Sequence, residues 1–322
     1  MTRKLLLSIC AMVAASVGGV THAQVFPDKP IRMIVPYPPG GGADAIARTI
    51  GPRLSETLGQ PVVIENRPGA NGNIGSAIVA KAAPDGYTLL MNTIGLVFSQ
   101  SIYKSLSFNV LNDFTPVTLV AGVPHILIVG PSLPVNSVAE VLAAAKAKPG
   151  KINYASVGVG SPFQMAGALF QSVGQVELAE IPYQGGGPAV QSVIAGQTDM
   201  TFANLLAAQP LIKAGRVKAL AVTSSKRSAI APDVPTLAES GLPGYDLSGW
   251  FGIWAPAGTP KPIIEVLNGA IVKVLNEPEI RARLERDGAE VIASTPAEFD
   301  RYVRSEYAKW DKVIKAARIQ AD

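Results

Sequence analysis

Residues 34–44 read Ile34-Val35-Pro36-Tyr37-Pro38-Pro39-Gly40-Gly41-Gly42-Ala43-Asp44. A β-rich apolar run, residues 31–37, leads into this stretch. A helical pattern follows at residues 43–58, with apolar residues four apart and Gly59 just after the last helical residue. A strand that passes through a glycine loop into a helix is the repeating unit of α/β folds with parallel strands. We therefore expect an α/β fold.

The same alternation continues along the chain. Strands are expected at residues 61–65, 87–92, 125–129, 151–155, 178–183, 200–203 and 219–223, and helices at residues 73–82, 137–148, 161–173, 188–195, 261–276 and 279–288. A capping box, Thr295 to Glu298, predicts one more helix with Phe299, Val303, Trp310 and Ile314 on one face. Residues 224–262 are rich in Pro and Gly, and their Trp250 and Trp254 are expected to pack in the core or at a hinge.

The first 23 residues have the pattern of a secretory signal peptide. Arg3 and Lys4 precede an apolar run, residues 5–20, and residues 21–23 place small side chains where a signal peptidase cleaves. A retained membrane anchor is the alternative, but the run is short for a spanning helix. We expect a periplasmic protein whose mature chain is long enough for two lobes with their own cores.

Composition excludes several classes of function. The net charge of +4 falls to about +2 without Arg3 and Lys4 of the signal peptide, which is mild for a nucleic-acid-binding surface, so no nucleic-acid partner is expected. The only cysteine, Cys10, lies in the signal peptide, and His125 is the one histidine beyond it. No hydrolase triad motif, metal-ligand spacing or cofactor fingerprint is present, so we expect no catalytic residue, no metal and no cofactor. A spatial pair of carboxylates, as in glycosidases, stays open as an alternative.

Three stretches share the plan of strand, glycine-rich loop and helix: residues 34–44, 153–162 and 181–188. The first turn of a helix has backbone N–H groups without partners and a partial positive charge. Glycines let a ligand approach those groups, which makes an anion site that needs no Arg or Lys. None of the loops matches a nucleotide motif, so a free carboxylate is the expected ligand.

Several residues have a structural interpretation beside the functional one. Ser161 and Gln164 form a capping box, so Gln164 either caps the helix or contacts ligand, and Ser161 can do both. Asp44 is expected to stabilise a helix start. Arg67 either binds a carboxylate or ties its loop to a neighbouring acid. His125 opens an apolar strand, which favours a buried structural role.

The motifs together resemble a known family. They comprise residues 36–44 with 65–70, residues 149–156, residues 182–186, Arg227 with residues 232–236 and 239–241, and residues 251–260. In order and spacing they are similar to the Bug receptors, the extracytoplasmic solute-binding components of tripartite tricarboxylate transporters. The resemblance spans nearly the whole chain beyond the signal peptide.

The resemblance implies a type II periplasmic-binding-protein fold, with two α/β lobes, two crossover segments and a ligand cleft between the lobes. On the present sequence, residues 24–122 plus 224–322 would form the first lobe and residues 123–223 the second. The lobes would close around ligand about crossings near residues 120–123 and 219–223.

The resemblance also implies a set of ligand-binding residues: Pro39, Gly40, Gly41, Gly42, Thr93, Gly160, Ser161, Gln164, Tyr183, Gln184, Gly185, Gly186 and Asn204. Family members often carry a histidine at the position of Gln164. If this position lines the cleft, its neutral side chain would suit a less acidic ligand, an amide or an aromatic acid.

The leading hypothesis is a monomeric binding receptor, not an enzyme. Its ligand would be a di- or tricarboxylate, an acidic amino acid or an aromatic acid, and its partners the membrane subunits of a tripartite transporter. A secreted α/β enzyme with a carboxylate pair is a second hypothesis. A signalling adaptor that docks on a membrane sensor kinase is a third.

Overall fold

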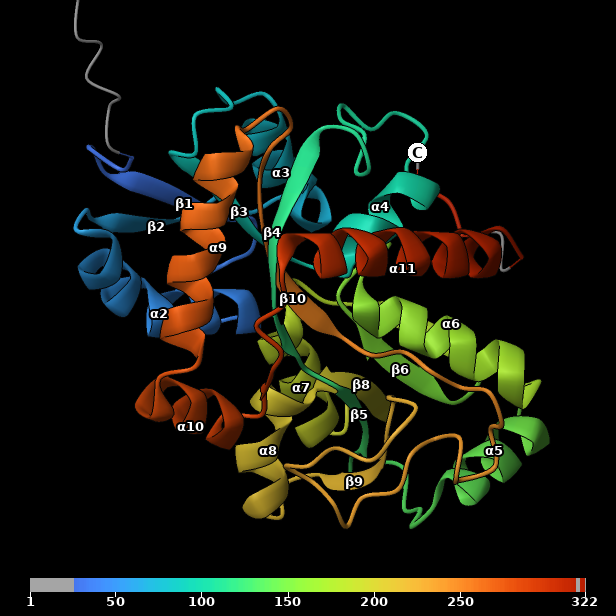
Figure 1. Cartoon of the computed structure of the whole chain (residues 1–322). Helices are drawn as coiled ribbons and strands as arrows, with labels where there is room; N and C mark the ends of the chain where they lie inside the picture. Colours follow the sequence, from blue (N-terminus) through green and yellow to red (C-terminus); the bar gives the residue numbers. More distant parts are fainter. Residues whose placement is uncertain (1–25, 317–318, 322) are drawn as a thin grey trace, which may run out of the picture.

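The computed structural model describes residues 26–316 and 319–321, so the expected signal peptide lies outside the described residues. Two β-sheets organise this described part of the chain (Figure 1). The upper one in Figure 1 has the order β11 (Glu290–Val291), β4 (Phe114–Gly122), β10 (Trp250–Pro256), β3 (Thr88–Thr93), β1 (Ile31–Val35) and β2 (Val62–Asn66). The lower one has the order β7 (Ala179–Pro182), β6 (Asn153–Ser156), β8 (Met200–Asn204), β5 (His125–Val129) and β9 (Lys218–Val222). Each sheet together with the helices that pack on it is called a lobe: the upper lobe contains the first sheet and the lower lobe contains the second.

The expected α/β fold is confirmed, but both sheets are mixed rather than parallel. β1 pairs in parallel with β2 and β3, and β6 pairs in parallel with β7 and β8. β10 is antiparallel to β3 and β4, and β5 is antiparallel to β8 and β9. The antiparallel strands adjoin the points where the chain passes between the lobes.

Helices cover both faces of the upper sheet, because alternate strand residues point to opposite sides. On β1, Met33 and Val35 pack in the cluster of α2 (Gly42–Leu58) and α9 (Lys261–Leu275), whereas Ile34 packs with α4 (Gly95–Ile102) and α11 (Pro296–Ala316). The expected apolar face of α11 is confirmed: Phe299, Val303, Trp310 and Ile314 are buried. The remaining upper-lobe helices are α10 (Pro278–Arg286), α3 (Asn73–Ala80) and the short 3₁₀ helix η1 (Ala70–Gly72).

The lower sheet follows the same rule. Ile126 and Ile128 of β5 pack with α7 (Gly186–Ile194) and α8 (Leu205–Lys213). Leu127 and Val129 pack on the side of α5 (Val138–Ala147) and α6 (Pro162–Gly174). In the described residues no helix is long and apolar enough to cross a membrane, and no group of His, Cys, Asp or Glu could hold a metal ion.

Two crossings connect the lobes. The first runs from the end of β4 to the start of β5, and the second returns to β10 at Trp250. They touch, because the Val123 amide donates to the Gly249 carbonyl oxygen at 2.8 Å. The Thr223 hydroxyl, just after β9, donates to carbonyl oxygens of both segments, at 3.0 Å to His125 and 2.7 Å to Leu247.

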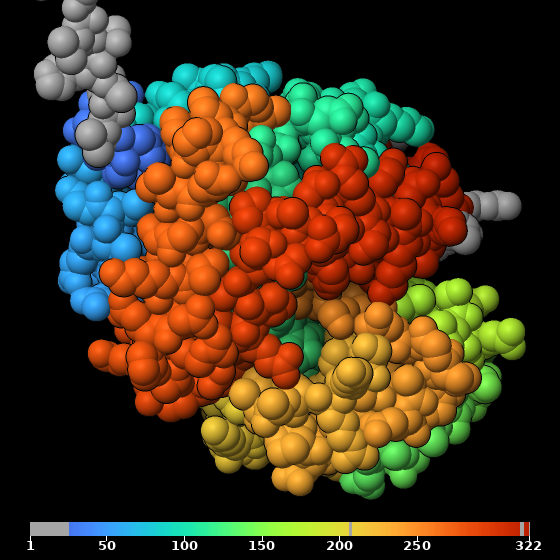
Figure 2. All heavy atoms as spheres, viewed as in Figure 1, coloured from blue at the N-terminus to red at the C-terminus, as the bar shows by residue number. Residues whose placement is uncertain are grey.

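The segment between β9 and β10 lies along the lower lobe, whereas we expected the upper lobe to resume at residue 224. Val222 exchanges backbone hydrogen bonds with Pro235 and Leu237, and the Tyr245 hydroxyl donates to the Ala166 carbonyl oxygen of α6 at 2.8 Å. Figure 2 shows the C-terminal helix (red) above this segment (gold to orange). An ion pair of 2.9 Å between Lys309 and Asp246 joins the two.

Candidate functional site

The first glycine loop leads into α2 and leaves the first-turn amides of that helix open. Gly41 is the N-cap, and the first helical bond runs from the Ala45 amide to the Gly41 carbonyl oxygen. The amides of residues 42–44 precede this bond, which makes them available to an anion. A Cβ placed on Gly42 would lie 2.8 Å from the Phe251 ring, so the loop packs directly on β10.

Asp44 has the structural role expected of it. Its carboxylate is buried and accepts from the Gly40 amide, Arg48 and Asn66, each at 2.9 Å. Burial alone would raise the pKa of Asp44, but these bonds hold it below the usual value. The amide of Gly40 is therefore already engaged, while Pro39 and Gly41 are exposed beside it.

Thr93, at the end of β3, is part of a polar cluster. Its hydroxyl is 3.0 Å from the Tyr37 hydroxyl and accepts from the Gly95 amide at 3.0 Å. The Tyr37 hydroxyl donates to Asn92 Oδ1 at 2.8 Å, and burial raises the pKa of Tyr37 to about 12. Thr93 pairs in register with Phe251, which places it beside the first glycine loop.

Asn71 completes this cluster and was not among the residues that the sequence pointed to. Its Nδ2 is buried and has no hydrogen-bond partner among the described residues. This Nδ2 is close to two glycines of the site: a Cβ added to Gly95 would lie 3.9 Å from it, and a Cβ added to Gly160 would lie 3.3 Å from it. A buried amide donor without a partner is costly, so Asn71 has the capacity to donate to an acceptor bound at this point.

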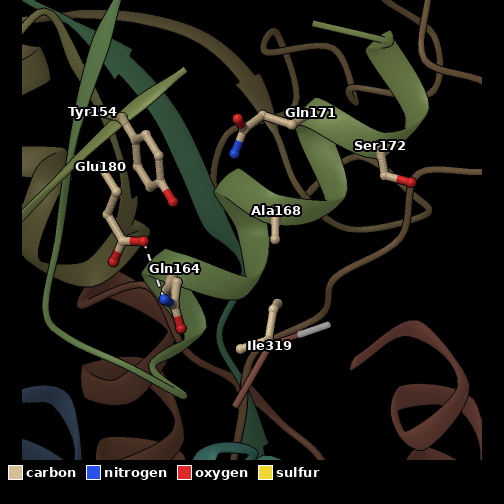
Figure 3. A pocket seen from close by; sticks show the side chains of 7 residues that line it. All are labelled: Tyr154, Gln164, Ala168, Gln171, Ser172, Glu180 and Ile319. Carbon is tan, nitrogen blue, oxygen red and sulfur yellow. Dashed lines mark hydrogen bonds between the residues drawn. The ribbon is translucent and has the colours of Figure 1, made fainter. Parts of the chain in front are cut away.

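The second glycine loop, before α6, belongs to the lower lobe. Ser161 is the N-cap, and its hydroxyl accepts from the Gln164 amide at 3.2 Å. The Gln164 side chain accepts from the Gly160 amide at 2.8 Å and donates to Glu180 at 3.1 Å (Figure 3). Ser161 thus caps the helix, but the expected capping box is incomplete, because the Ser161 amide donates to the Gly158 carbonyl oxygen and the Gln164 side chain accepts from Gly160 instead. Both ends of the Gln164 side-chain amide are engaged. It also lines a cavity of about 410 Å³ beside α6.

The third glycine loop, before α7, lies near a histidine. Gly185 is the N-cap, and the first helical bond starts at Ala189, so the amide of Gly186 is open to a ligand. A Cβ on Gly186 would be 3.2 Å from the Phe163 ring, which in turn contacts the His125 ring edge-on at 5.5 Å. Of the other residues expected here, Tyr183 is half-buried, Gln184 is exposed, and Asn204 pairs in register with His125.

His125 is buried, as expected for a structural residue. Its Nδ1 has no hydrogen-bond partner among the described residues, and burial lowers its pKa to about 4. Arg67 pairs with Glu65 at 3.0 Å, which is the structural alternative that we gave for it. The same carboxylate bonds Arg32, and these bonds lower the pKa of Glu65 to about 2.

The second glycine loop touches the upper lobe. A Cβ on Gly160 would lie 3.1 Å from Ile102 Cδ1 and 3.3 Å from Asn71 Nδ2. The Tyr103 hydroxyl donates to the Val159 carbonyl oxygen at 3.4 Å. Gly42 and Thr93 thus lie close together, because Gly42 packs on the Phe251 ring and Thr93 pairs in register with Phe251. Gly160 of the lower lobe approaches them at Asn71.

Comparison with known proteins gives the same assignment along nearly the whole chain. The model of the tripartite tricarboxylate transporter family receptor, TctC, matches residues 46–319. Protein BugT of Bordetella pertussis is 37% identical over 317 residues, which are 98% of this chain and 97% of BugT.

Two solved structures share the fold. R. palustris Rpa4515 with adipate is 38% identical, with a TM-score of 0.87 over 92% of this chain and 99% of that one. MatC from Rhodopseudomonas palustris with bound malate is 34% identical, with a TM-score of 0.84 over 90% of this chain and 100% of that one. The expected periplasmic-binding-protein fold is confirmed, and the chain belongs to the TctC family of tripartite tricarboxylate transporter receptors, as a solute-binding protein of the Bug type.

Proposed function

We propose that this protein is a periplasmic receptor that holds a small dicarboxylate between its lobes and delivers it to a tripartite transporter in the membrane. One observation carries the proposal: the buried, unpartnered Nδ2 of Asn71 faces Gly160 of the other lobe. A donor in that position suits a carboxylate oxygen bound where the lobes meet. The related structures hold adipate and malate, which are both dicarboxylates.

The two ends of the ligand would be bound by different lobes. The upper lobe supplies the amides of residues 42–44 and Asn71, whereas Thr93 lies beside them with its hydroxyl donating to Tyr37. The lower lobe supplies the Ser161 hydroxyl and the amide of Gly186. We propose that the full set of residues around the ligand is Pro39, Gly40, Gly41, Gly42, Asn71, Thr93, Gly160, Ser161, Tyr183, Gln184, Gly185, Gly186 and Asn204, with Gln164 behind Gly160, from whose amide it accepts.

None of these residues is Arg or Lys. The attraction for an anion would come from the N-termini of α2, α6 and α7, whose partial charges and open amides act at short range. Binding of this kind depends on hydrogen-bond geometry more than on net charge. We therefore expect the receptor to distinguish dicarboxylates by the spacing of their carboxylates.

The signal-peptide pattern supports a periplasmic location, and the match to the receptor family supports a membrane transporter as partner. We propose that the protein acts as a monomer and without catalysis. Closure would bring Asn71 and Gly160 together around the ligand, with motion at the paired crossings Val123 and Gly249.

The test is calorimetric titration of protein that has been unfolded, washed free of ligand and refolded. The panel contains acetate, succinate, malate, glutarate, adipate and citrate, with adipamide as the neutral match to adipate. We expect binding of at least one dicarboxylate and none of adipamide. Failure of every carboxylate to bind would contradict the proposal, and conversion of a compound to product would favour an enzyme.

A further inference from the structure

We propose that Glu180 positions the ligand-binding loop of the lower lobe, residues 156–161, by holding both of its ends. The inference rests on the proposed function, because the loop is part of the proposed ligand site. Glu180 lies on β7, outside the loop, and contacts the site only through other residues.

The two carboxylate oxygens of Glu180 accept from Ser156, at one end of the loop, and from Gln164, which lies on α6 just beyond the other end. Oε1 accepts from the Ser156 hydroxyl at 2.6 Å, and Oε2 accepts from Gln164 Nε2 at 3.1 Å (Figure 3). The Ser156 hydroxyl in turn accepts from the Gly158 amide at 3.3 Å, and Gln164 Oε1 accepts from the Gly160 amide at 2.8 Å. One carboxylate therefore organises two backbone amides of a glycine-rich loop.

Such support matters because the loop has little stiffness of its own. Gly158 and Gly160 both have positive φ, at 96° and 76°, a region that few residues other than glycine adopt. Without side-chain partners, ordering these glycines at the moment of binding would cost conformational entropy. A loop already held in place lowers that cost, which is the basis of preorganised binding.

Glu180 also fixes which way the Gln164 amide faces. A carboxylate only accepts, so it selects the orientation in which Nε2 points to Glu180 and Oε1 points to Gly160. In that orientation the Gln164 backbone amide fills one acceptor site of the Ser161 hydroxyl. The hydrogen of that hydroxyl stays free to donate to a ligand. The chain of contacts thus runs from Glu180 through Gln164 to Ser161.

The side chains that hydrogen-bond Glu180, which include the Tyr154 phenol, are neutral, and this separates the arrangement from a surface ion pair. The phenol of Tyr154 lies beside the carboxylate (Figure 3). Burial and the neighbouring charge of Glu180 raise the pKa of Tyr154. Tyr154, Gln164 and Glu180 line the 410 Å³ cavity beside α6, so the carboxylate can be replaced without forcing atoms into a packed core.

The experiment compares dissociation constants and release rates for succinate, malate, glutarate and adipate among matched variants of the refolded protein. Glu180→Met removes both acceptor oxygens, and Glu177→Met is the control, because it makes the same change of charge at an exposed position nearby. Ser156→Ala removes one of the two bonds with little change of volume. The double variant E180Q/Q164E moves the carboxylate to position 164, where it can accept from Gly160 and from the new amide at 180.

We expect Glu180→Met to raise the dissociation constant about tenfold, Ser156→Ala about threefold, and Glu177→Met not at all. We expect the double variant to bind within about threefold of wild type, since each donor again faces an acceptor. A merely structural role would lower the unfolding temperature without this pattern of rescue.

The inference is overturned if Glu180→Met and Ser156→Ala bind as Glu177→Met does, or if the double variant binds as poorly as Glu180→Met. If Glu180→Met does not fold, the comparison of Ser156→Ala with the double variant decides in the same way. Loss of binding by wild type itself would instead contradict the proposed function, so the two failures are distinguishable.

Discussion

The Val123 amide and the Gly249 carbonyl oxygen, 2.8 Å apart, join the two crossings between the lobes by a hydrogen bond. A Cβ on Gly249 would lie 2.4 Å from the Val123 carbonyl oxygen and 2.8 Å from the His125 ring. Gly249 does not have positive φ, so lack of space is what requires glycine here. The proposed closure of the lobes would therefore pivot where the two backbones approach most closely.

Gly249→Ala is therefore expected to destabilise the protein. The added methyl group must push the crossings apart, and overpacking of this kind costs about 1–3 kcal/mol of the free energy of unfolding. Urea denaturation measures the loss. Gly269→Ala is the control, because nothing lies within 4 Å of a Cβ there and the residue is inside α9. We expect that change to stabilise the protein by up to about 1 kcal/mol; equal effects of the two variants would contradict the prediction.

Asn71→Asp is expected to weaken dicarboxylate binding at least about tenfold. The substitution keeps the shape of the side chain and replaces the unpartnered Nδ2 donor by an oxygen that repels a carboxylate. Asp also tolerates the left-handed backbone at this position, where φ is 52°. Calorimetric titration measures the effect. Asn112→Asp, at an exposed position, makes the same chemical change and is expected to leave the dissociation constant unaltered.

Local patterns predicted much of the fold. Strand β5 was expected at residues 125–129 and begins and ends there, and the buried face of α11 was predicted residue by residue. Strand β10 was missed, because all seven of its residues are buried and show no alternation. Its antiparallel pairing with β3 and β4 is a long-range arrangement that no local pattern carries.

The candidate site divides in the same way. The glycine loops before α2, α6 and α7 were predictable, since a turn and the helix that it opens are neighbours in sequence. Asn71 and Glu180 were not predictable, because their roles depend on contacts with residues distant in sequence. Asn71 lies beside Gly160 of the other lobe, and Glu180 accepts from Ser156 and Gln164. The one local signal for Asn71 is its position in the turn-like run Gly69-Ala70-Asn71-Gly72, where asparagine tolerates a left-handed backbone.

His125 is expected to make the stability of the protein fall in mild acid. Burial lowers its pKa from 6.5 to about 4, so between these values the unfolded chain holds a proton that the folded protein does not. The contribution of His125 is therefore complete above pH 6.5 and is lost as the pH falls toward 4, by about 3 kcal/mol.

Urea unfolding of wild type and His125→Phe at pH 7, 6, 5 and 4.5 tests this expectation. Carboxylates also titrate in this range, but they are common to both proteins, so the difference between the two isolates the histidine. We expect the variant to lose less stability than wild type between pH 7 and 4.5. Parallel curves would show that the imidazole is accessible to protons in the folded state.

Tyr103→Phe tests whether the contact between the lobes slows ligand release. The Tyr103 hydroxyl of the upper lobe donates to the Val159 carbonyl oxygen of the lower lobe at 3.4 Å, next to Gly160. Removing the hydroxyl keeps the ring and leaves the cores of both lobes intact. The free energy of unfolding without ligand should then change by less than about 0.5 kcal/mol.

The hydrogen bond between Tyr103 and Val159 would form only when the lobes are closed, so we expect its loss to raise the rate of ligand dissociation. A single weak hydrogen bond corresponds to roughly a two- to fivefold faster release of dicarboxylate, with little change in the association rate. Stopped-flow fluorescence of Trp250, Trp254 and Trp310 measures both rates. Tyr307→Phe, on α11, is the matched control. Release as slow as in wild type would mean that the lobes separate without breaking this contact, and would place the barrier to opening at the paired crossings, Val123 and Gly249.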